Sequence, residues 1–350
     1  MNHVNPTSSG DAAAKTPAPS PALLFDTINA YQRTAAIKAA IELDVFTALA
    51  DSPANADAIA RQANASGRGI RILCDFLTVL GFLTKSGDRY ALTPDSALFL
   101  SRKSPAYAGG TLEFLLSDHL RGAFHPLTDA VRSGRTAQPQ DGSVTPEHPM
   151  WVSFARSMGP LMHPAAAALA GLFALNPNRP ASVLDIAAGH GEWGLAFARK
   201  FPAAKVVALD WSPVLEVARA NARAAGVADR FSTIAGSAFD VDLGHDYDVV
   251  LVPNFLHHFN TADCVRFLKR AQAALRPGGM VAIIEFVTNE DRVTPPAAAG
   301  FSLIMLATTP EGDAYTLAEY SNMLAQSGFS APRQHSLPAS MNVALVATKS

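Results

Sequence analysis

The chain has 350 residues, 49% of them apolar, and a formal net charge of −2 at pH 7. This length accommodates one large or two modest domains, and the near-neutral charge argues against nucleic acid or another polyanion as a partner. The two cysteines, Cys74 and Cys264, lie far apart in apolar helical patterns. This placement argues against a disulfide framework or a thiolate metal site, and we expect a cytoplasmic protein.

The first part of the chain predicts a tail followed by helices. Residues 1–20 are rich in Ala, Ser, Pro and Asn and lack the apolar core of a signal peptide, so we expect a disordered tail. No later apolar run reaches the length of a membrane span without interruption, so we expect no membrane partner. Residues 22–50 have helical spacing that places Leu23, Ile28, Val45 and Phe46 on one broad face.

A winged-helix pattern follows. Short helical segments are predicted near residues 56–60 and 70–80, and a turn at Gly87 and Asp88 separates two short strands. A winged helix that reads DNA needs a basic recognition helix. Here that helix has only Arg68 and Arg71, and Asp75 offsets them, so the pattern disfavours a DNA-binding regulator.

The second half predicts an α/β fold. Residues 133–149 are rich in Gly and Pro and predict a loop, and residues 151–170 resume as a helical connector. Apolar strands then alternate with helices, with strands expected at residues 183–186, 205–209, 231–234, 247–252, 280–284 and 343–347. This alternation predicts a Rossmann-like, doubly wound, mostly parallel sheet covered on both faces.

A glycine turn after the first of these strands is the strongest chemical signal. Gly189, Gly191 and Gly194 match the dinucleotide pattern G-x-G-x-x-G, and Asp210 follows at the expected distance, so an NAD-dependent oxidoreductase is one interpretation. However, Asp185 lies inside the strand, where its carboxylate would repel a pyrophosphate and attract a cationic ligand. The chain also lacks a separate substrate domain downstream, which further disfavours the NAD interpretation.

The segment D-x-A-x-G-x-G that begins at Asp185 resembles the first motif of class I methyltransferases, which use S-adenosylmethionine. Several weaker motifs follow in the order found in small-molecule O-methyltransferases of the caffeate and acetylserotonin type and their bacterial relatives. They are residues 43–46, 80–83, 154–158, 254–264 and 275–279. The resemblance spans residues 21–350. It implies a winged-helix homodimerisation domain at residues 21–115, a helical connector and loop at 116–165, and a cofactor-binding catalytic domain at 166–350.

The resemblance also implies a cofactor site and a catalytic pair. The cofactor residues that it implies are Asp185, Gly189, Gly191, Asp210, Ser237, Ala238, Phe239 and Asn254. His257 matches the family's general base, and Glu285 matches the acid that orients it. A second family glutamate is replaced by Ala314, beside Asp313, which puts the strength of base catalysis in question.

The acceptor is expected to be a small aromatic molecule that is methylated at a hydroxyl oxygen. The resemblance implies a lining of Phe154, Met158, Met162, His163, Phe301 and Met305. Methylation of N, S or C, or a use of S-adenosylmethionine without methyl transfer, would need almost the same scaffold. A metal held by His257, His258 and a third ligand such as Asp263 or His245 is disfavoured, because adjacent side chains on an extended segment point apart.

Overall fold

The computed structural model describes residues 19–176 and 179–350, so the tail predicted for residues 1–20 lies outside the described part except for residues 19 and 20. The chain divides into two compact units at Pro105 and Ala106. We describe each unit by itself. No helix in the described ranges is long and apolar enough to cross a membrane.

The first unit is mostly helical and contains a small antiparallel sheet in the order β1-β3-β2. Its elements are α1 (Ala22–Ile28), α2 (Ala30–Glu42), α3 (Val45–Ala48), β1 (Ala54–Asn55), α4 (Ala56–Gln62), α5 (Gly67–Val79), β2 (Leu83–Ser86), β3 (Arg89–Leu92) and α6 (Pro94–Phe99). The sequence of helices followed by a β-hairpin confirms the predicted winged helix. Asp75 on α5 binds Arg71 and Lys85 through ion pairs, so the charge of Arg71 is partly neutralised.

The first helices of this unit do not bury the single apolar face predicted for residues 22–50. Val45 and Phe46 are buried, as their spacing suggests, but Leu23 is 77% exposed and Ile28 is 57% exposed. Helix α1 buries no residue at all. Its apolar side chains therefore do not contribute to the core of their own unit.

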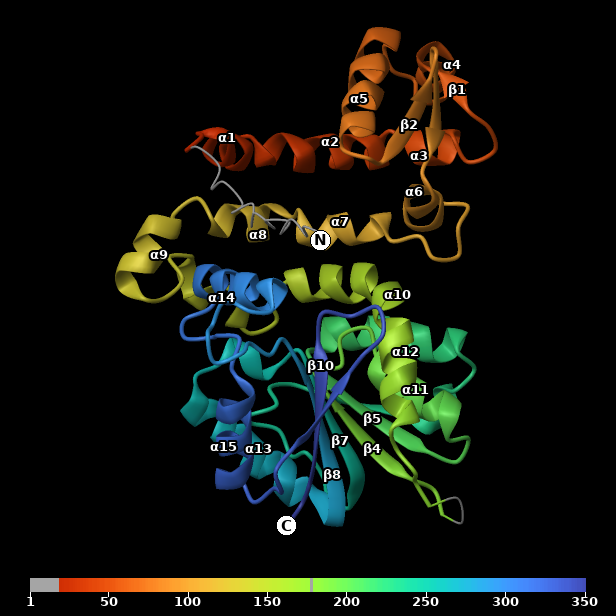
Figure 1. Cartoon of the computed structure of the whole chain (residues 1–350). Coiled ribbons are helices and arrows are strands. Elements are labelled where there is room, and N and C mark those ends of the chain that lie inside the picture. The colour runs from red at the N-terminus through yellow and green to blue at the C-terminus, as the bar shows by residue number, and fades with distance from the viewer. Residues whose placement is uncertain (1–18, 177–178) are drawn as a thin grey trace, which may run out of the picture. The chain divides into compact units, whose positions relative to one another are not determined.

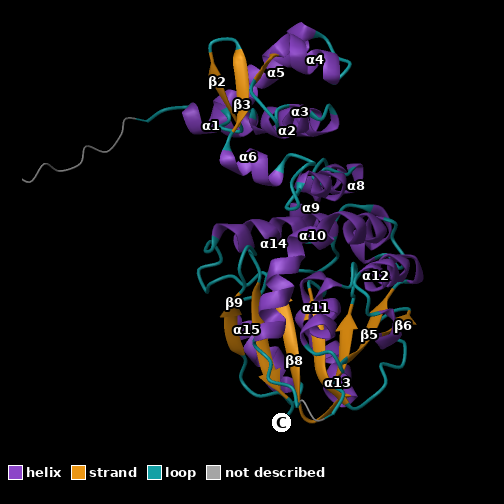
Figure 2. Cartoon of the chain, turned by 90° about the vertical axis from the view of Figure 1, so that its right-hand side faces the viewer, coloured by secondary structure: helices purple, strands orange, loops and turns teal. Residues whose placement is uncertain are grey.

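The second unit begins with short helices that lead into one long helix. These elements are η1 (Gly109–Thr111), α7 (Leu112–Leu115), α8 (Asp118–Ala123), α9 (Leu127–Ser133), η2 (Pro139–Val144) and α10 (Met150–Gly171). The segment expected to be a loop at 133–149 thus includes one short 3₁₀ helix, and α10 confirms the predicted connector helix. Figures 1 and 2 show α10 and α14 (Pro296–Thr308) lying across one end of the sheet of this unit.

In the described residues the sheet has seven strands in the order β6-β5-β4-β7-β8-β10-β9. β10 is antiparallel to both of its neighbours, β8 and β9, and the remaining pairs are parallel. The strands are β4 (Ser182–Ile186), β5 (Lys205–Asp210), β6 (Phe231–Ala235), β7 (Tyr247–Pro253), β8 (Leu275–Glu285), β9 (Arg333–Ser336) and β10 (Val343–Thr348). All six predicted strands are present. The additional strand, β9, is a polar edge strand with no buried residue.

Helices cover both faces of this sheet (Figure 1). They are α11 (Glu192–Lys200), α12 (Ser212–Ala224), α13 (Thr261–Ala274) and α15 (Leu317–Gln326). Two short 3₁₀ turns, η3 (Ala228–Arg230) and η4 (Leu256–His258), also belong to this unit. One apolar core lies between the sheet and α13 and α15. A second lies between the sheet and α10, α11 and α12. This sandwich confirms the predicted doubly wound architecture and brings the carboxyl ends of β4, β5, β7 and β8 to one edge.

Candidate active site

The glycine turn connects β4 to α11 through three left-handed residues. Ala187, Gly189 and Gly191 have φ angles of 48°, 57° and 78°. Such angles strain any residue that has a Cβ atom, so Ala187 marks a place where the surrounding fold imposes the backbone conformation. A Cβ atom at Gly189 would lie 3.4 Å from the Phe154 ring, and one at Gly191 would lie 3.2 Å from Ala218 Cβ. The backbone of this turn therefore packs closely against its neighbours.

Asp185 lies beneath this turn and is completely buried. Its Oδ2 atom accepts a hydrogen bond of 2.9 Å from the Gly194 backbone N–H. Its Oδ1 atom is also buried and finds no hydrogen-bond partner among the described residues. Burial raises the pKa of Asp185 to about 8, although the Gly194 N–H works in the opposite direction. A cationic ligand beside the unpaired Oδ1 atom would favour the ionised form of this buried carboxyl group, whereas a phosphate would oppose it.

Asp210 connects the end of β5 to the same turn. Its two oxygens accept hydrogen bonds from the backbone N–H groups of Gly189, at 2.8 Å, and Trp211, at 2.7 Å. Burial raises its pKa to about 6, against the effect of these two bonds. Each carboxylate oxygen has a further lone pair, so Asp210 can still accept hydrogen bonds from the hydroxyls of a ribose.

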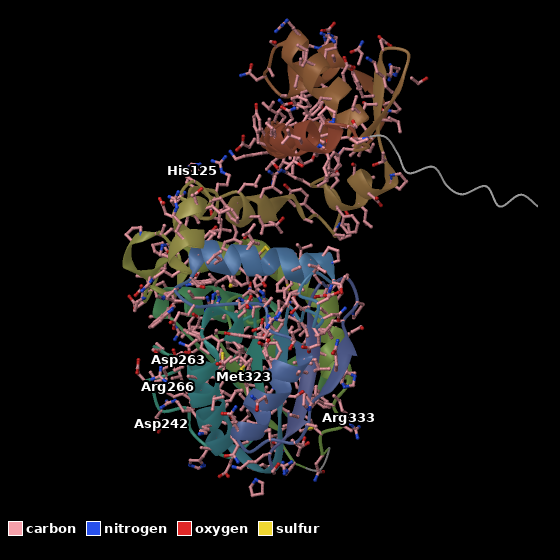
Figure 3. The ribbon with its side chains drawn as sticks, turned by 60° about the vertical axis from the view of Figure 1, so that its left-hand side comes forward. His125, Asp242, Asp263, Arg266, Met323 and Arg333 are labelled. Atoms are coloured by element: carbon pink, nitrogen blue, oxygen red, sulfur yellow. The ribbon has the colours of Figure 1, made fainter. Side chains whose placement is uncertain are left out.

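The structure places the remaining predicted cofactor residues around the next two strand ends. Ser237 Oγ accepts a bond of 3.2 Å from the Phe239 N–H, and Ala238 is buried. The Arg266 guanidinium carbon lies 4.6 Å from the centre of the Phe239 ring. Arg266 in turn binds Asp263 at 2.9 Å, and both lie on one side of this unit in Figure 3.

Asn254 follows β7 with a left-handed φ of 50°. Its backbone N–H donates to the Ile284 carbonyl at 2.8 Å, and its side-chain oxygen accepts 3.0 Å from Asn342 Nδ2. Asn342 comes from the segment before β10, and nothing in its local sequence predicts this contact. It fixes the Asn254 side chain at the edge of the sheet.

His257 and Glu285 form a buried pair at the ends of β7 and β8. His257 Nδ1 lies 2.5 Å from Glu285 Oε2, and the two side chains are 4% and 0% exposed. Glu285 Oε1 accepts three backbone N–H groups, from Phe255, Leu256 and His257, at 3.0, 2.9 and 3.3 Å. The carboxylate therefore holds both the short helix η4 and the imidazole ring that η4 carries.

The family's second orienting acid is absent at Ala314, which is fully buried. The carboxylate of Asp313, beside it, forms an ion pair of 3.4 Å with Arg292 instead of contacting His257. Gly312 packs directly against the His257 carbonyl oxygen, which a Cβ atom would overlap. Glu285 is thus the carboxylate that contacts the imidazole of His257 in the described structure.

Aromatic rings surround the pair formed by His257 and Glu285. Phe301 meets His257 edge to face with ring centres 4.7 Å apart, and it stacks on Phe286 at 3.9 Å. Trp151 meets the ring of His258 at 5.2 Å. Phe154 stacks on His190 at 5.9 Å.

The residues predicted to line the acceptor pocket have different surroundings. Phe154 and Phe301 take part in these ring contacts, and Met305 is buried in α14. Met162 packs against the core shared with α11. His163 is exposed and lies 3.1 Å from Glu192, which also binds Arg199.

Sequence reasoning missed His190, which lies between the two glycines of the turn. It is 1% exposed, and its Nδ1 atom accepts a bond of 3.0 Å from the Glu192 N–H. Burial lowers its pKa to about 4, so the ring is neutral at pH 7. Its position between two glycines of the turn is the sequence signal that could have drawn attention to it.

The described residues contain no group of three or more side chains suited to hold a metal ion. His245, considered above as a third ligand for His257 and His258, is exposed and lies 2.8 Å from Asp246. The site instead combines a buried acid under a glycine turn, an acid at the end of β5 and a histidine–glutamate pair. Together with the strand order, this combination defines an S-adenosylmethionine-dependent methyltransferase.

Comparisons with known proteins agree with this class. Residues 165–330 match the model of the O-methyltransferase domain, and residues 25–102 match that of the O-methyltransferase dimerisation domain. A solved structure from Nostoc punctiforme, assigned to the O-methyltransferases, is 52% identical with a TM-score of 0.92 and covers 95% of this chain and 100% of its own. The chain belongs to the S-adenosylmethionine-dependent O-methyltransferase family.

Curated relatives are more distant. The tetracenomycin polyketide synthesis 8-O-methyltransferase of Streptomyces glaucescens is 29% identical over 306 residues, which is 86% of this chain and 88% of the relative. The 3-hydroxy-5-methyl-1-naphthoate 3-O-methyltransferase of Streptomyces sahachiroi is 29% identical over 316 residues, 89% and 90% of the two chains. The structure of human N-acetylserotonin methyltransferase has a TM-score of 0.81 at 23% identity, covering 96% and 99%, and supports the fold.

Proposed function

We propose that this O-methyltransferase uses His257 as a general base to methylate a hydroxyl group on a small, polycyclic aromatic acceptor. The observation that carries the proposal is the buried pair of His257 and Glu285, which lies among aromatic rings beyond the carboxyl ends of β7 and β8. In open α/β sheets this edge is where ligands bind.

The residues around the glycine turn fit S-adenosylmethionine. The free Oδ1 atom of Asp185 suits the positively charged methionine half, and Asp210 suits the ribose hydroxyls. Ser237 and the Phe239 ring suit the adenine, and the left-handed turn at Gly189 and Gly191 brings backbone close to the ligand. When bound, S-adenosylmethionine supplies a methyl group on a sulfonium, which an acceptor oxygen can displace.

The contact with Glu285 favours one tautomer of the His257 imidazole. A carboxylate next to Nδ1 favours the tautomer that carries its proton there, which leaves the Nε2 lone pair available to accept a proton from the acceptor. A neutral imidazole and a phenol differ by about 3.5 pKa units, or roughly 5 kcal/mol for complete proton transfer. Holding the reacting oxygen in place contributes about 7 to 11 kcal/mol, so positioning is the larger effect.

The ring contacts and the relatives both support an aromatic acceptor. Phe301, stacked on Phe286, presents a flat apolar wall beside His257. Two relatives are named for a tetracenomycin polyketide and a hydroxynaphthoate, which are fused aromatic systems. Fused rings offer the apolar area that such a wall can bury.

The test compares wild-type protein with His257→Ala. We expect methyl transfer to 2,7-dihydroxynaphthalene to fall by about 10²- to 10⁴-fold, because general-base help is lost. The affinity for S-adenosylhomocysteine should change little, since His257 does not contact the glycine turn. His245→Ala, at an exposed histidine, is the control. Equal losses of turnover and of cofactor affinity would mean that His257 acts as a structural residue.

We also propose that the protein is a homodimer that assembles through its first unit. Its residues 25–102 match a dimerisation domain, and α1 exposes Leu23, Phe25 and Ile28. Exposed apolar side chains gathered on one helix are typical of an interface. Sedimentation equilibrium should give a dimer at micromolar concentration, and Phe25→Asp should shift it towards monomer. A wild-type monomer would contradict the proposal.

A further inference from the structure

Three polar atoms that are buried without a partner lie on segments linked to the catalytic histidine. They are Nδ1 of His258, Nε2 of His119 and Oε1 of Gln138, and none finds a hydrogen-bond partner among the described residues. An unsatisfied buried polar atom costs about 1 to 3 kcal/mol, so native proteins seldom keep several without a use. None of these atoms has a role in the proton transfer derived above.

Ring contacts and one backbone hydrogen bond connect the residues that carry these atoms into one strip, which starts at His257. The ring of His258 lies 4.3 Å from that of His257 and 5.2 Å from that of Trp151. The backbone N–H of Trp151 donates to the His148 carbonyl at 3.1 Å, and the His148 ring lies 4.3 Å from that of His119. The strip therefore leads from His257 across the start of α10 to α8.

Gln138 belongs to the same strip through its other contacts. Its Nε2 atom donates to the His119 carbonyl at 3.0 Å, so the side chain points towards α8 and its oxygen is left unpaired. The Trp151 indole N–H is held by the Ser143 carbonyl at 3.1 Å, in the 3₁₀ helix that Gln138 precedes. These bonds fix the amide and the indole in place. The three unpaired atoms come from three separate segments of the chain.

The polar side chains of the strip are uncharged. Burial lowers the pKa of His119, His148 and His258, and for His258 and His119 a neighbouring histidine lowers it further. Each neutral imidazole provides one donor and one acceptor, and the free Gln138 oxygen provides an acceptor. A hydroxyl or ring carbonyl can bond to such a set, whereas a carboxylate would need a charged partner to offset its desolvation.

We propose that His258, His119 and Gln138 form a recognition subsite for a second, uncharged polar group of the acceptor, either a phenolic hydroxyl or a ring carbonyl. The inference rests on the proposed function, because it assumes an aromatic acceptor whose first hydroxyl faces His257. The subsite selects polyhydroxylated or quinone-like fused aromatics over those with one hydroxyl and over aromatic acids. A site with polar groups left unpaired rejects a ligand that lacks the matching group.

The test uses naphthalenes that differ in one substituent. The probes are 2-naphthol, its 6- and 7-hydroxy derivatives, its 6- and 7-acetyl derivatives and the corresponding 6- and 7-carboxylic acids, each assayed with S-adenosylmethionine. We expect kcat/KM for at least one hydroxy or acetyl derivative to exceed that for 2-naphthol by about tenfold, chiefly through KM, after correction for two equivalent hydroxyls. The acids should fall below 2-naphthol.

Substitutions then assign the effect to the subsite. His258→Phe, His119→Phe and Gln138→Leu should each bring the ratio of kcat/KM values towards one, and His258→Asn, which keeps a donor and an acceptor, should retain part of it. His125→Phe is the matched control, since His125 is exposed on the surface near α8 (Figure 3) and should leave the ratio unchanged. Thermal melting confirms that each variant folds.

The outcomes separate the subsite from the proposed function. Equal kcat/KM values across the wild-type series, or a ratio that survives all three substitutions, would overturn the subsite while methylation continues. Binding of S-adenosylhomocysteine without methylation of any naphthol would overturn the acceptor class and the subsite together. Failure to bind S-adenosylhomocysteine at all would overturn the proposed function.

Discussion

The substitution Glu285→Gln separates the charge of this side chain from its shape. In the native protein, one carboxylate oxygen accepts three backbone N–H groups and the other faces His257 Nδ1. A glutamine can keep the three backbone bonds only by turning its NH₂ group towards Nδ1. The imidazole must then accept at Nδ1 and carry its proton on Nε2, the atom that the mechanism needs free.

The alternative orientation of the amide is no better. With its oxygen towards Nδ1, the NH₂ group would face the N–H groups of Phe255, Leu256 and His257, so donors would meet donors. Each neutral hydrogen bond contributes roughly 1 kcal/mol, and the first orientation keeps the three backbone bonds that the second loses. The protein should therefore adopt the first orientation, and the variant should fold with the wrong histidine tautomer.

We expect kcat of Glu285→Gln to fall by about 10²- to 10⁴-fold, the usual value of general-base help. The assay follows S-adenosylhomocysteine release with 2,7-dihydroxynaphthalene as the acceptor, and calorimetry measures S-adenosylhomocysteine affinity, which should stay within about threefold. Glu290→Gln, at an exposed position, controls for the substitution itself. A folded Glu285→Gln protein with kcat within tenfold of wild type would refute the orienting role of Glu285.

Two further predictions concern the glycine turn and η4. Because the pKa of Asp185 is about 8 when folded and near 3.8 when unfolded, the folded state binds more protons between these values, and wild-type stability should fall as pH rises from 4 to 8. In Asp185→Asn, the free energy of unfolding measured in urea should differ less between pH 5 and pH 8 than in wild type. The variant should also bind S-adenosylmethionine more weakly. Parallel pH dependences of stability for the two proteins would contradict this prediction. Gly312→Ala should lower kcat at least tenfold and cost about 1 to 3 kcal/mol, since a Cβ there overlaps the His257 carbonyl oxygen. Gly300→Ala is the control, because a Cβ atom at this position on α14 meets open space. It should leave kcat unchanged and stabilise the folded protein by about 0.5 to 1 kcal/mol, which thermal melting can measure. Equal effects of the two substitutions would count against this explanation.

The strands of the catalytic unit could be predicted because most of them are buried. β7 has no exposed residue, and such apolar runs of strand length have few other stable arrangements. The edge strand β9 was missed because its residues are mostly polar and exposed, so burial leaves no pattern in the sequence. Its pairing with β10 is provided by backbone hydrogen bonds, which any residue except proline can make.

Some features of the site can be identified from the sequence, and others appear only in the folded chain. Asp185 and the glycines were identifiable because they lie on one continuous segment with a strand before it and a helix after it. The contact of Asn342 with Asn254 and that of His119 with His148 join residues distant in sequence, so only the folded chain reveals them.

For helix α1, the sequence does not determine which surface buries its apolar face. The apolar spacing of Leu23 and Ile28 indicates a face that needs burial, but it does not say whether that face meets its own unit or another chain. In the structure both side chains are exposed, which supports the dimer proposed from the match to a dimerisation domain.

The most direct test of the central claim is a single-turnover reaction with S-adenosylmethionine labelled with tritium in its methyl group. Excess wild-type protein is mixed with the labelled donor and 2,7-dihydroxynaphthalene, and the product is analysed by mass spectrometry. We predict that the label appears in an aryl methyl ether together with one equivalent of S-adenosylhomocysteine, and that His257→Ala forms the ether at least 10²-fold more slowly. Label on carbon, or equal rates for the two proteins, would contradict His257-assisted O-methylation.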